Sequence, residues 1–210
     1  DQLADIVDPL QVFPGERANY GSNSMAVAGA IIEQQAGEGF EAYLKRRLLD
    51  PLDMNNTSFN PTAAEVSRMG PVYINLFGRW SPFVTPPNPD ATNLNPALAA
   101  GLYGTIDDYA RFLLMFRNQG RYFGNQILSE DSIETIRTNQ IGDITFVGLV
   151  GAGTSTRYGL GCWLDQVQEN GVASFVSSTG FAGTYPWYDE VNDLAGIFFI
   201  QVSLTGGTDT

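Results

Sequence analysis

Hydrophobic and polar positions along the chain follow two different patterns, which meet near residue 143. Before that point, apolar residues recur three and four positions apart in several stretches, which is the spacing of an amphipathic helix. Polar residues and glycines that start or end helices flank these stretches. The pattern predicts helices over residues 24–36, 39–49, 105–119 and 129–138.

The flanking residues also predict how three of these helices are capped. Ser22 or Ser24 can cap the first helix, and Gly37 directly follows its last apolar position. Thr105 and Ser129 stand one residue ahead of the two later helices, where a hydroxyl can accept a hydrogen bond from a free backbone N–H.

After residue 143 the apolar residues alternate with polar ones or form short runs, which is the pattern of strands. Turn-forming residues separate the runs, so neighbouring strands should pair as antiparallel hairpins. Helices followed by an antiparallel sheet predict an α+β fold, in one domain with a helical and loop region over about 1–142 and strands over about 143–205. The expected strands lie near 144–150, 157–165, 172–177, 183–188 and 194–203.

Residues 53–100 are rich in loop-forming residues, and the segment 81–97 contains five prolines. So many prolines argue against a regular element there, because proline lacks the N–H that a ladder or helix needs. A loop of this length within a compact domain is usually functional, so we expect it to form a wall over a binding site.

Composition narrows the functional classes. The 210 residues carry 23 acidic and 11 basic side chains, a formal net charge of −12. A surface this acidic repels phosphate backbones, so we do not expect nucleic acid as a partner. No apolar run approaches the roughly 20 residues that a helix needs to cross a bilayer, so no membrane span is expected.

The chain contains no histidine and a single cysteine, Cys162. A Ser-His-Asp triad, a Cys-His pair and a histidine-based zinc site therefore cannot be built from these residues. The glycines of 151–156 lack the third glycine of a dinucleotide fingerprint, and no phosphate-binding loop precedes Lys45. We expect neither a cofactor nor a metal.

Two polar clusters remain as candidates for chemistry. The first is Tyr20-Gly21-Ser22, which stands directly ahead of the first predicted helix. The second spans residues 177–187, SSTGFAGTYPW, and joins two predicted strands. Taken singly, each has a purely structural interpretation, as a capped helix start and as a glycine-rich hairpin.

Taken together with their surroundings, these clusters resemble the serine beta-lactamase and penicillin-binding-protein-like superfamily, most closely its class C-like branch of esterases and D-aminopeptidases. The resemblance runs through most of the chain, in the family's order and at its spacing. The stretches that carry it are VFPGERANYGSNSMAVAGAIIEQQAG, LLDPLDMNNTSF, NPALAAGLYGTIDDYARFLLMFRNQGRYFGNQILSEDSIE and TGFAGTYPWYDEVNDLAGIFFIQ.

The resemblance implies an acyl-enzyme mechanism in which a serine of an S-x-x-K motif attacks an ester or amide, without a histidine. Tyr20 takes the position of the family's proton-relay tyrosine. The asparagine position of the same motif falls on Ser22, because the distance from Tyr20 to Gly29 fits the family without an insertion. Asn23 would fill it if the turn carries an extra residue.

The third motif of the family aligns with Ser178, Thr179 and Gly180. Ser178 replaces a cation or a histidine, which weakens recognition of a substrate carboxylate and favours a carboxylesterase-type reaction on a small ester or amide. Gly180 would let a substrate lie close to the strand. The backbone N–H of Phe181 would form half of an oxyanion hole.

The chain contains no S-x-x-K motif, since its only lysine is Lys45 and residue 42 is alanine. The resemblance therefore implies that residues 1–210 are a C-terminal portion, with the nucleophile elsewhere. We expect this portion to need the missing N-terminal segment, as another chain or through self-association, and not to fold stably alone. The resemblance favours a periplasmic or secreted protein. The alternative is a non-catalytic binding or assembly module.

Overall fold

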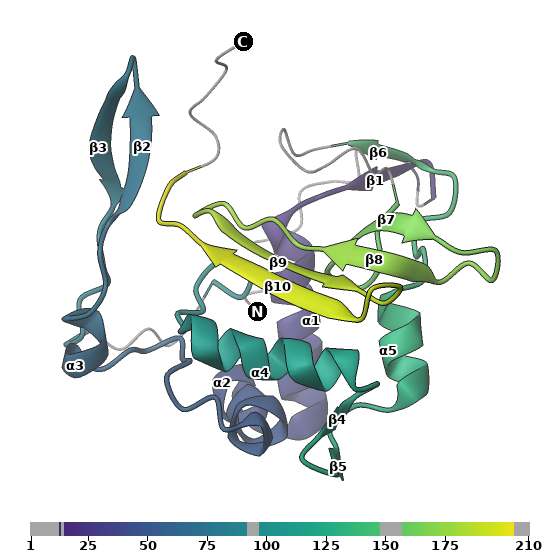
Figure 1. Cartoon of the computed structure of the whole chain (residues 1–210). Coiled ribbons are helices and arrows are strands. Elements are labelled where there is room, and N and C mark those ends of the chain that lie inside the picture. The colour runs from purple at the N-terminus through teal and green to yellow at the C-terminus, as the bar shows by residue number, and fades with distance from the viewer. Residues whose placement is uncertain (1–12, 14, 92–96, 148–156, 204–210) are drawn as a thin grey trace.

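The computed structural model describes residues 13, 15–91, 97–147 and 157–203 and has the predicted α+β fold (Figure 1). Its main sheet is antiparallel, with the strands in the order β10-β9-β8-β7. Each strand therefore pairs with its neighbour in sequence, which is the hairpin arrangement that the alternating pattern predicts. These strands are β7 (Trp163–Val167), β8 (Ala173–Ser177), β9 (Thr184–Asp189) and β10 (Leu194–Phe199).

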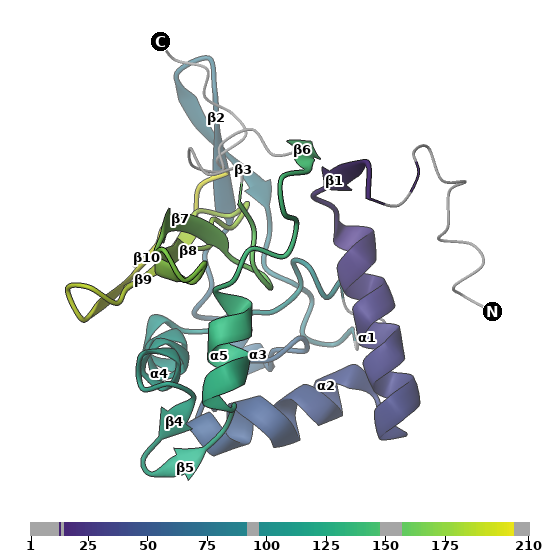
Figure 2. The same cartoon turned by 90° about the vertical axis from the view of Figure 1, so that its right-hand side faces the viewer.

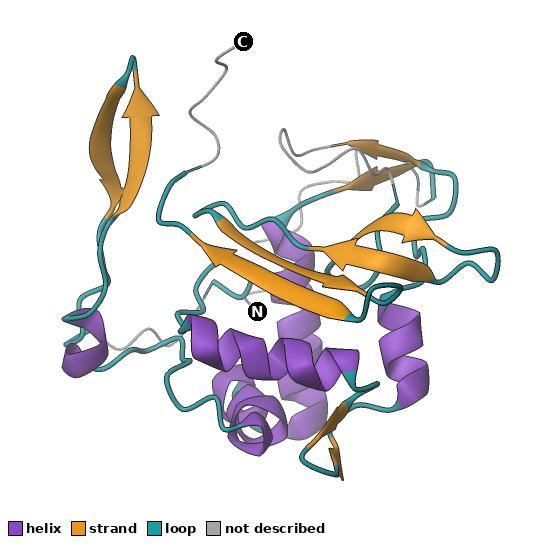
Figure 3. Ribbon diagram, in the orientation of Figure 1, coloured by secondary structure: helices purple, strands orange, loops and turns teal. Residues whose placement is uncertain are grey.

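The predicted helices are present (Figure 3), and the predicted caps at Thr105, Ser129 and Gly37 are confirmed. Thr105 accepts a hydrogen bond from the N–H of Asp108, Ser129 accepts one from that of Ser132, and Gly37 ends the first helix at a φ of 69°. The helices are α1 (Ser22–Ala36), α2 (Phe40–Leu44), α3 (Ala63–Val66), α4 (Ile106–Arg117) and α5 (Glu130–Ile136).

The predicted cap of α1 is wrong. The helix already begins at Ser22, Gly21 is its N-cap, and no side chain accepts a hydrogen bond at that end. A serine inside the first turn has passed the cap position, so its hydroxyl no longer faces the free N–H groups. The Ser24 hydroxyl instead donates to the Gly21 carbonyl at 2.8 Å.

The second helical stretch changes its pitch along its length. After α2 the backbone continues as a π-helix, η1 (Lys45–Leu49), and then as a 3₁₀ turn, η2 (Asp50–Leu52). Leu49 and Leu52 are both buried. The stretch ends at Asp53, whose φ is 55°.

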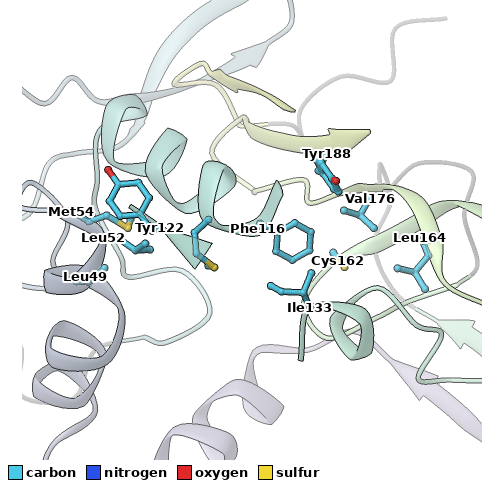
Figure 4. Packing of buried hydrophobic residues seen from close by; sticks show 12 residues of the cluster. Leu49, Leu52, Met54, Phe116, Tyr122, Ile133, Cys162, Leu164, Val176 and Tyr188 are labelled. Atoms are coloured by element: carbon cyan, nitrogen blue, oxygen red, sulfur yellow. The ribbon is translucent and has the colours of Figure 1, made fainter. Parts of the chain in front are cut away.

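The helices α4 and α5 cover one face of the main sheet. The hydrophobic core lies between these helices and the sheet (Figure 4). Ring contacts connect the two layers. The ring of Tyr188 in β9 meets the ring of Phe116 in α4 edge to face, with centroids 5.7 Å apart. Burying such aliphatic and aromatic side chains is the main force that holds the layers together. The buried cluster consists of Leu49, Leu52, Met54, Met115, Phe116, Tyr122, Ile133, Cys162, Leu164, Ala173, Val176 and Tyr188.

The opposite face of the sheet is less well covered. Phe175 and Trp187 stack there with ring centroids 5.9 Å apart and planes 10° from parallel. Leu194 and Phe198 lie on the same face and are exposed. An apolar sheet face with exposed large side chains is unusual for a monomeric protein surface.

The structure corrects the predicted pairing of the strand near 144–150. Within that range, β6 (Thr145–Val147) is a strand, and residues 148–150 lie outside the described part. It does not join a hairpin but pairs in parallel with β1 (Arg17–Asn19), a strand that the sequence pattern does not predict. Figure 2 shows β1 beside β6 and leading directly into α1.

The predicted loop region also contains regular structure. A β-hairpin made of β2 (Val72–Leu76) and β3 (Arg79–Val84) stands away from the main sheet in Figures 1 and 2. Pro82 lies within β3, next to a register irregularity of the pair. Among the described strands β3 pairs only with β2, so it is an edge strand, where a proline without a ladder hydrogen bond is tolerated. A second, short hairpin joins β4 (Arg121–Tyr122) to β5 (Asn125–Gln126).

Candidate functional site

Tyr20 lies in the two-residue connection between β1 and α1, where the chain leaves a strand and enters a helix. Its side chain is 45% exposed, so its phenol is accessible to a small molecule. The neighbouring Ser22 is the first residue of α1 and is also exposed. The structure thus places both Tyr20 and Ser22 at the positive end of the α1 helix dipole.

The ring of Tyr20 packs against two other aromatic side chains. It stacks on Trp163 with centroids 6.1 Å apart and planes 16° from parallel. It also meets Tyr158 edge to face at 6.1 Å, and Tyr158 contacts Trp163 at 4.8 Å. Such offset and edge-to-face pairs are the favoured geometries of aromatic rings. We call Tyr20, Tyr158 and Trp163 the aromatic cluster.

The other candidate residues lie between β8 and β9, in the turn that spans residues 178–183. The N–H of Ser178 donates to the Pro186 carbonyl at 3.1 Å, and the N–H of Gly180 donates to the Thr184 carbonyl at 2.7 Å. The N–H of Phe181 donates to no acceptor among the described residues. It is therefore the one N–H of residues 180 and 181 that is free to bind an oxyanion.

Glycines give this turn its shape. Gly183 has a φ of 86°, and a Cβ placed there would lie 2.5 Å from the Ile200 carbonyl oxygen. A Cβ at Gly180 would lie 3.2 Å from the Cβ of Thr184. A side chain at Gly183 would therefore clash with the neighbouring strand, and one at Gly180 would be tightly packed against Thr184.

Trp163 connects the two motifs. It is the first residue of β7, it is only 3% exposed, and it pairs with Ser177 of β8. Ser177 directly precedes Ser178, so the same tryptophan contacts Tyr20 and lies opposite the strand end that leads into the third motif. Ser177 is held in turn by a hydrogen bond of 2.9 Å from its hydroxyl to Asp165. Two segments more than 150 residues apart are thus both linked to Trp163.

Two cavities border the turn. The larger, of about 730 Å³, extends from the base of the β2–β3 hairpin to α4 and is bordered by Phe181 and Thr184. Most of its other lining is apolar, including Val84, Phe112 and Phe199. A smaller cavity of about 160 Å³ lies between α4 and the sheet, and Ser177 and Ser178 border it. The rings of Phe83 in the hairpin and Phe181 in the turn have centroids 6.1 Å apart. Part of the 53–100 region therefore lies beside the turn of residues 178–183.

Neither a reactive thiol nor a metal site is indicated among the described residues. Burial raises the pKa of the Cys162 thiol to about 12, and Asp165 adds to the rise, so this thiol stays protonated at neutral pH. Within the described part of the chain, no three His, Cys, Asp or Glu side chains gather in a way that could hold a metal ion. No described helix combines the length and apolarity required to cross a bilayer.

Sequence reasoning missed Tyr158 and Trp163. Both lie in the segment YGLGCW, for which the sequence pattern predicts a strand over 157–165, whereas β7 starts only at Trp163. The available signal was the spacing of two aromatic residues around two glycines, a pattern typical of a tight turn that brings both rings to one side. Nothing local to the segment indicates that Tyr20 is the third member.

Comparison with known proteins identifies the relatives of this chain. The family model described as Beta-lactamase matches residues 6–208. The protein Rv1367c of Mycobacterium tuberculosis is 28% identical over 187 residues, which cover 85% of this chain and 45% of the relative. The chain thus spans about half the length of the curated relatives it matches.

Solved structures show the same fold. EstCE1, described as a hydrolase with promiscuous acyltransferase activity, superposes with a TM-score of 0.74 over 96% of this chain and 55% of its own, at 20% identity. The octameric penicillin-binding protein homologue of Pyrococcus abyssi gives a TM-score of 0.61 over 89% of this chain and 39% of its own, at 25% identity.

Proposed function

The chain belongs to the beta-lactamase family, and we propose that it forms part of a serine hydrolase that cleaves a small ester or amide through an acyl-enzyme, with a carboxylesterase-type reaction favoured. The nucleophilic serine and its lysine lie outside these 210 residues, because the chain has no S-x-x-K motif. One observation supports this function above the others. An exposed tyrosine stacks on Trp163, and the same tryptophan pairs with Ser177, which leads into the turn that carries the free Phe181 N–H.

Each group then has a defined task. The serine hydroxyl attacks the substrate carbonyl, and the oxyanion that forms accepts a hydrogen bond from the Phe181 N–H. Tyr20 passes the proton released by the serine to the leaving oxygen or nitrogen, and water later releases the acyl group by the reverse route. Ser22, Ser178, Thr179 and Gly180 line the place where the substrate lies.

The preference for an ester rests on what surrounds this place. Ser178 has no charge, so it offers only a hydroxyl where binding of a substrate carboxylate would need a cation. The cavity that borders Phe181 is lined mainly by apolar side chains. Both features favour an uncharged ester over a carboxylate-bearing lactam or peptide.

The proposed partner is a further protein segment, in the same polypeptide, in another chain or in a second copy of this one. The apolar sheet face with Phe175, Trp187, Leu194 and Phe198 supports this part of the proposal. Covering such a face removes apolar surface from water and so stabilises the fold. A cooperative, monomeric unfolding transition of residues 1–210 alone would contradict it.

The test of the function uses the full-length protein, p-nitrophenyl esters and a fluorophosphonate probe that labels active serines. Tyr20→Phe keeps the ring but removes the hydroxyl, so we expect kcat to fall by roughly 100-fold or more. Tyr43→Phe removes a phenol from α2, away from the site, and should change kcat less than about twofold. Undiminished turnover in Tyr20→Phe would remove the assigned role.

The second candidate function is a non-catalytic binding or assembly module. The serines at positions 22 and 178, where the family carries asparagine and a cation or histidine, favour it. Absence of both turnover and probe labelling in the full-length protein would support this module over the enzyme.

A further inference from the structure

The two partners of Tyr20 in the aromatic cluster differ from it in burial. Trp163 is 3% exposed and Tyr158 is half-buried, whereas Tyr20 is 45% exposed. A substrate can therefore reach the Tyr20 phenol, while the other two rings form the surface on which this ring rests. The near-parallel stack on Trp163 limits tilting of the Tyr20 ring, and the edge contact from Tyr158 limits its sideways movement.

A rigid turn holds the two supporting rings. Tyr158 and Trp163 pair across it, and the N–H of Gly159 donates to the Cys162 carbonyl at 2.9 Å. The end of α5 fixes the turn, because the Ile136 carbonyl accepts hydrogen bonds from the Leu160 N–H at 3.1 Å and from the Cys162 thiol at 3.4 Å. The rings are thus attached to the core and not to a free loop.

The same turn also continues into the sheet. Trp163 is the first residue of β7 and pairs with Ser177, one residue before the candidate turn that begins at Ser178. Its backbone is therefore tied to the third motif, while its side chain contacts the second. A shift of Trp163 would therefore change the position of Tyr20 relative to the Phe181 N–H.

We propose that Trp163 and Tyr158 are positioning residues that hold the Tyr20 phenol at its working distance from the turn of residues 178–181. This inference rests on the proposed function of Tyr20. It assigns to YGLGCW a role in catalysis that acts through Tyr20 alone, since neither supporting side chain takes part in proton transfer.

The environment of Tyr158 is consistent with this division of roles. Burial raises the pKa of the Tyr158 phenol well above its ordinary value, and the nearby Tyr20 and Cys162 raise it further. Tyr158 thus keeps its proton throughout the physiological range. It supplies a neutral ring beside Tyr20 and does not compete with it as an acid or base.

The test is a double-mutant cycle on kcat in the full-length protein, with p-nitrophenyl butyrate as the substrate. Trp163→Phe, Trp163→Leu and Tyr158→Leu are each measured with Tyr20 and with Tyr20→Phe. A misplaced catalytic group costs up to ~100-fold, so we expect Trp163→Leu and Tyr158→Leu to lower kcat about 10- to 100-fold with KM changed less than about threefold. Trp163→Phe keeps an aromatic ring and should retain more activity than Trp163→Leu.

In the Tyr20→Phe background these same substitutions should cost less than about twofold, because the group that they position is already absent. Trp187→Phe is the matched control. Its ring stacks on Phe175 in the same sheet and makes no ring contact with Tyr20 among the described residues, so any effect should be equal in both backgrounds. Tyr158→Leu keeps the test decisive if removal of the buried Trp163 prevents folding.

The outcomes separate the two proposals. Suppose that Tyr20→Phe lowers kcat, and that the Trp163 and Tyr158 variants lower kcat by the same factor with Tyr20 and with Tyr20→Phe. These residues then support only the fold, and the positioning role is wrong. If Tyr20→Phe leaves kcat unchanged, the proposed function of Tyr20 itself fails. Near-ultraviolet circular dichroism gives a readout independent of activity. The difference spectrum produced by Tyr20→Phe should be smaller in the Trp163→Leu background than with Trp163 present, because Trp163→Leu removes the ring that orders Tyr20.

Discussion

Asp108 provides a sharp test of how the helical layer is held together. Its side chain is fully buried in the first turn of α4, yet it binds groups that lie about 50 residues earlier in the chain. One carboxylate oxygen accepts hydrogen bonds from the Asn56 N–H at 2.7 Å and from the Thr57 hydroxyl at 2.9 Å. The other accepts one from Arg111 at 2.6 Å. Asp108→Ala removes all of these acceptors at once.

The contacts set the expected loss of stability. Each bond from Asn56 and Thr57 has a charged acceptor in a largely buried place, so its loss costs roughly 1.5 kcal/mol. Arg111 is one-third exposed and can be rehydrated, so breaking that ion pair adds less than about 1 kcal/mol. We therefore expect Asp108→Ala to lower the free energy of unfolding by about 3 kcal/mol, and Asp108→Asn, which keeps one carbonyl oxygen, by about half as much.

Guanidinium denaturation of the full-length protein, followed by far-ultraviolet circular dichroism, measures this loss as a lower midpoint at an unchanged slope. Asp107→Ala is the control, because Asp107 occupies the same helix turn but is exposed. It forfeits only its interaction with the helix dipole, below about 1 kcal/mol. If both alanine variants lower the free energy of unfolding by the same amount, the hydrogen bonds of Asp108 do not hold α4 to Asn56 and Thr57.

Two further predictions concern the YGLGCW turn. Gly159→Ala would bring a Cβ to 2.0 Å from the Ile136 carbonyl oxygen, so we expect the free energy of unfolding to fall by about 2 kcal/mol, measured as a lower midpoint of thermal unfolding. Gly39→Ala is the control, because the nearest atom to its added Cβ is a Glu33 carboxylate oxygen at an ordinary 4.0 Å, and it should change the midpoint little. The pKa of the Cys162 thiol, raised to about 12, predicts that 5,5′-dithiobis(2-nitrobenzoate) at pH 8 reacts at least ~100-fold faster with the denatured protein than with the folded protein. The rate for the folded protein should rise only as the pH approaches 12. Rapid labelling of the folded thiol at pH 8 would contradict the burial of Cys162.

The helices and the main sheet were predictable because their determinants are local. The hydroxyls of Thr105 and Ser129 cap α4 and α5, and Gly37 ends α1, since each acts on backbone groups within four residues. The hairpins of the main sheet likewise join neighbours in sequence. The division of the chain at residues 142–143 into a helical and a strand region stays a prediction.

The pairing of β1 with β6 could not be predicted in this way. Each strand has three residues, and the partners lie about 128 positions apart, so no period or turn signals the pair. The β2–β3 hairpin was missed for the opposite reason. Pro82 argues against a strand at this position, but that argument holds only for central strands, and β3 is an edge strand.

The candidate site was predictable in part. Tyr20 and residues 178–181 follow from the family resemblance, and the structure connects them through Trp163. Their catalytic roles, and the choice of Ser22 over Asn23, stay predictions. Trp163 could not be identified because its contact with Tyr20 spans more than 140 residues and depends on where the YGLGCW turn is attached.

The change of pitch between α2 and η2 has a consequence for how this stretch tolerates a change in its length. Every residue added to an α-helix rotates all that follows by about 100°, which would turn Leu52 away from the core. The π-helical turn η1 fits an extra residue into one wider turn, and the 3₁₀ turn tightens the chain again before Asp53. The wider turn at Lys45–Leu49 is therefore where this stretch can absorb a one-residue change in length while Leu49 and Leu52 stay buried.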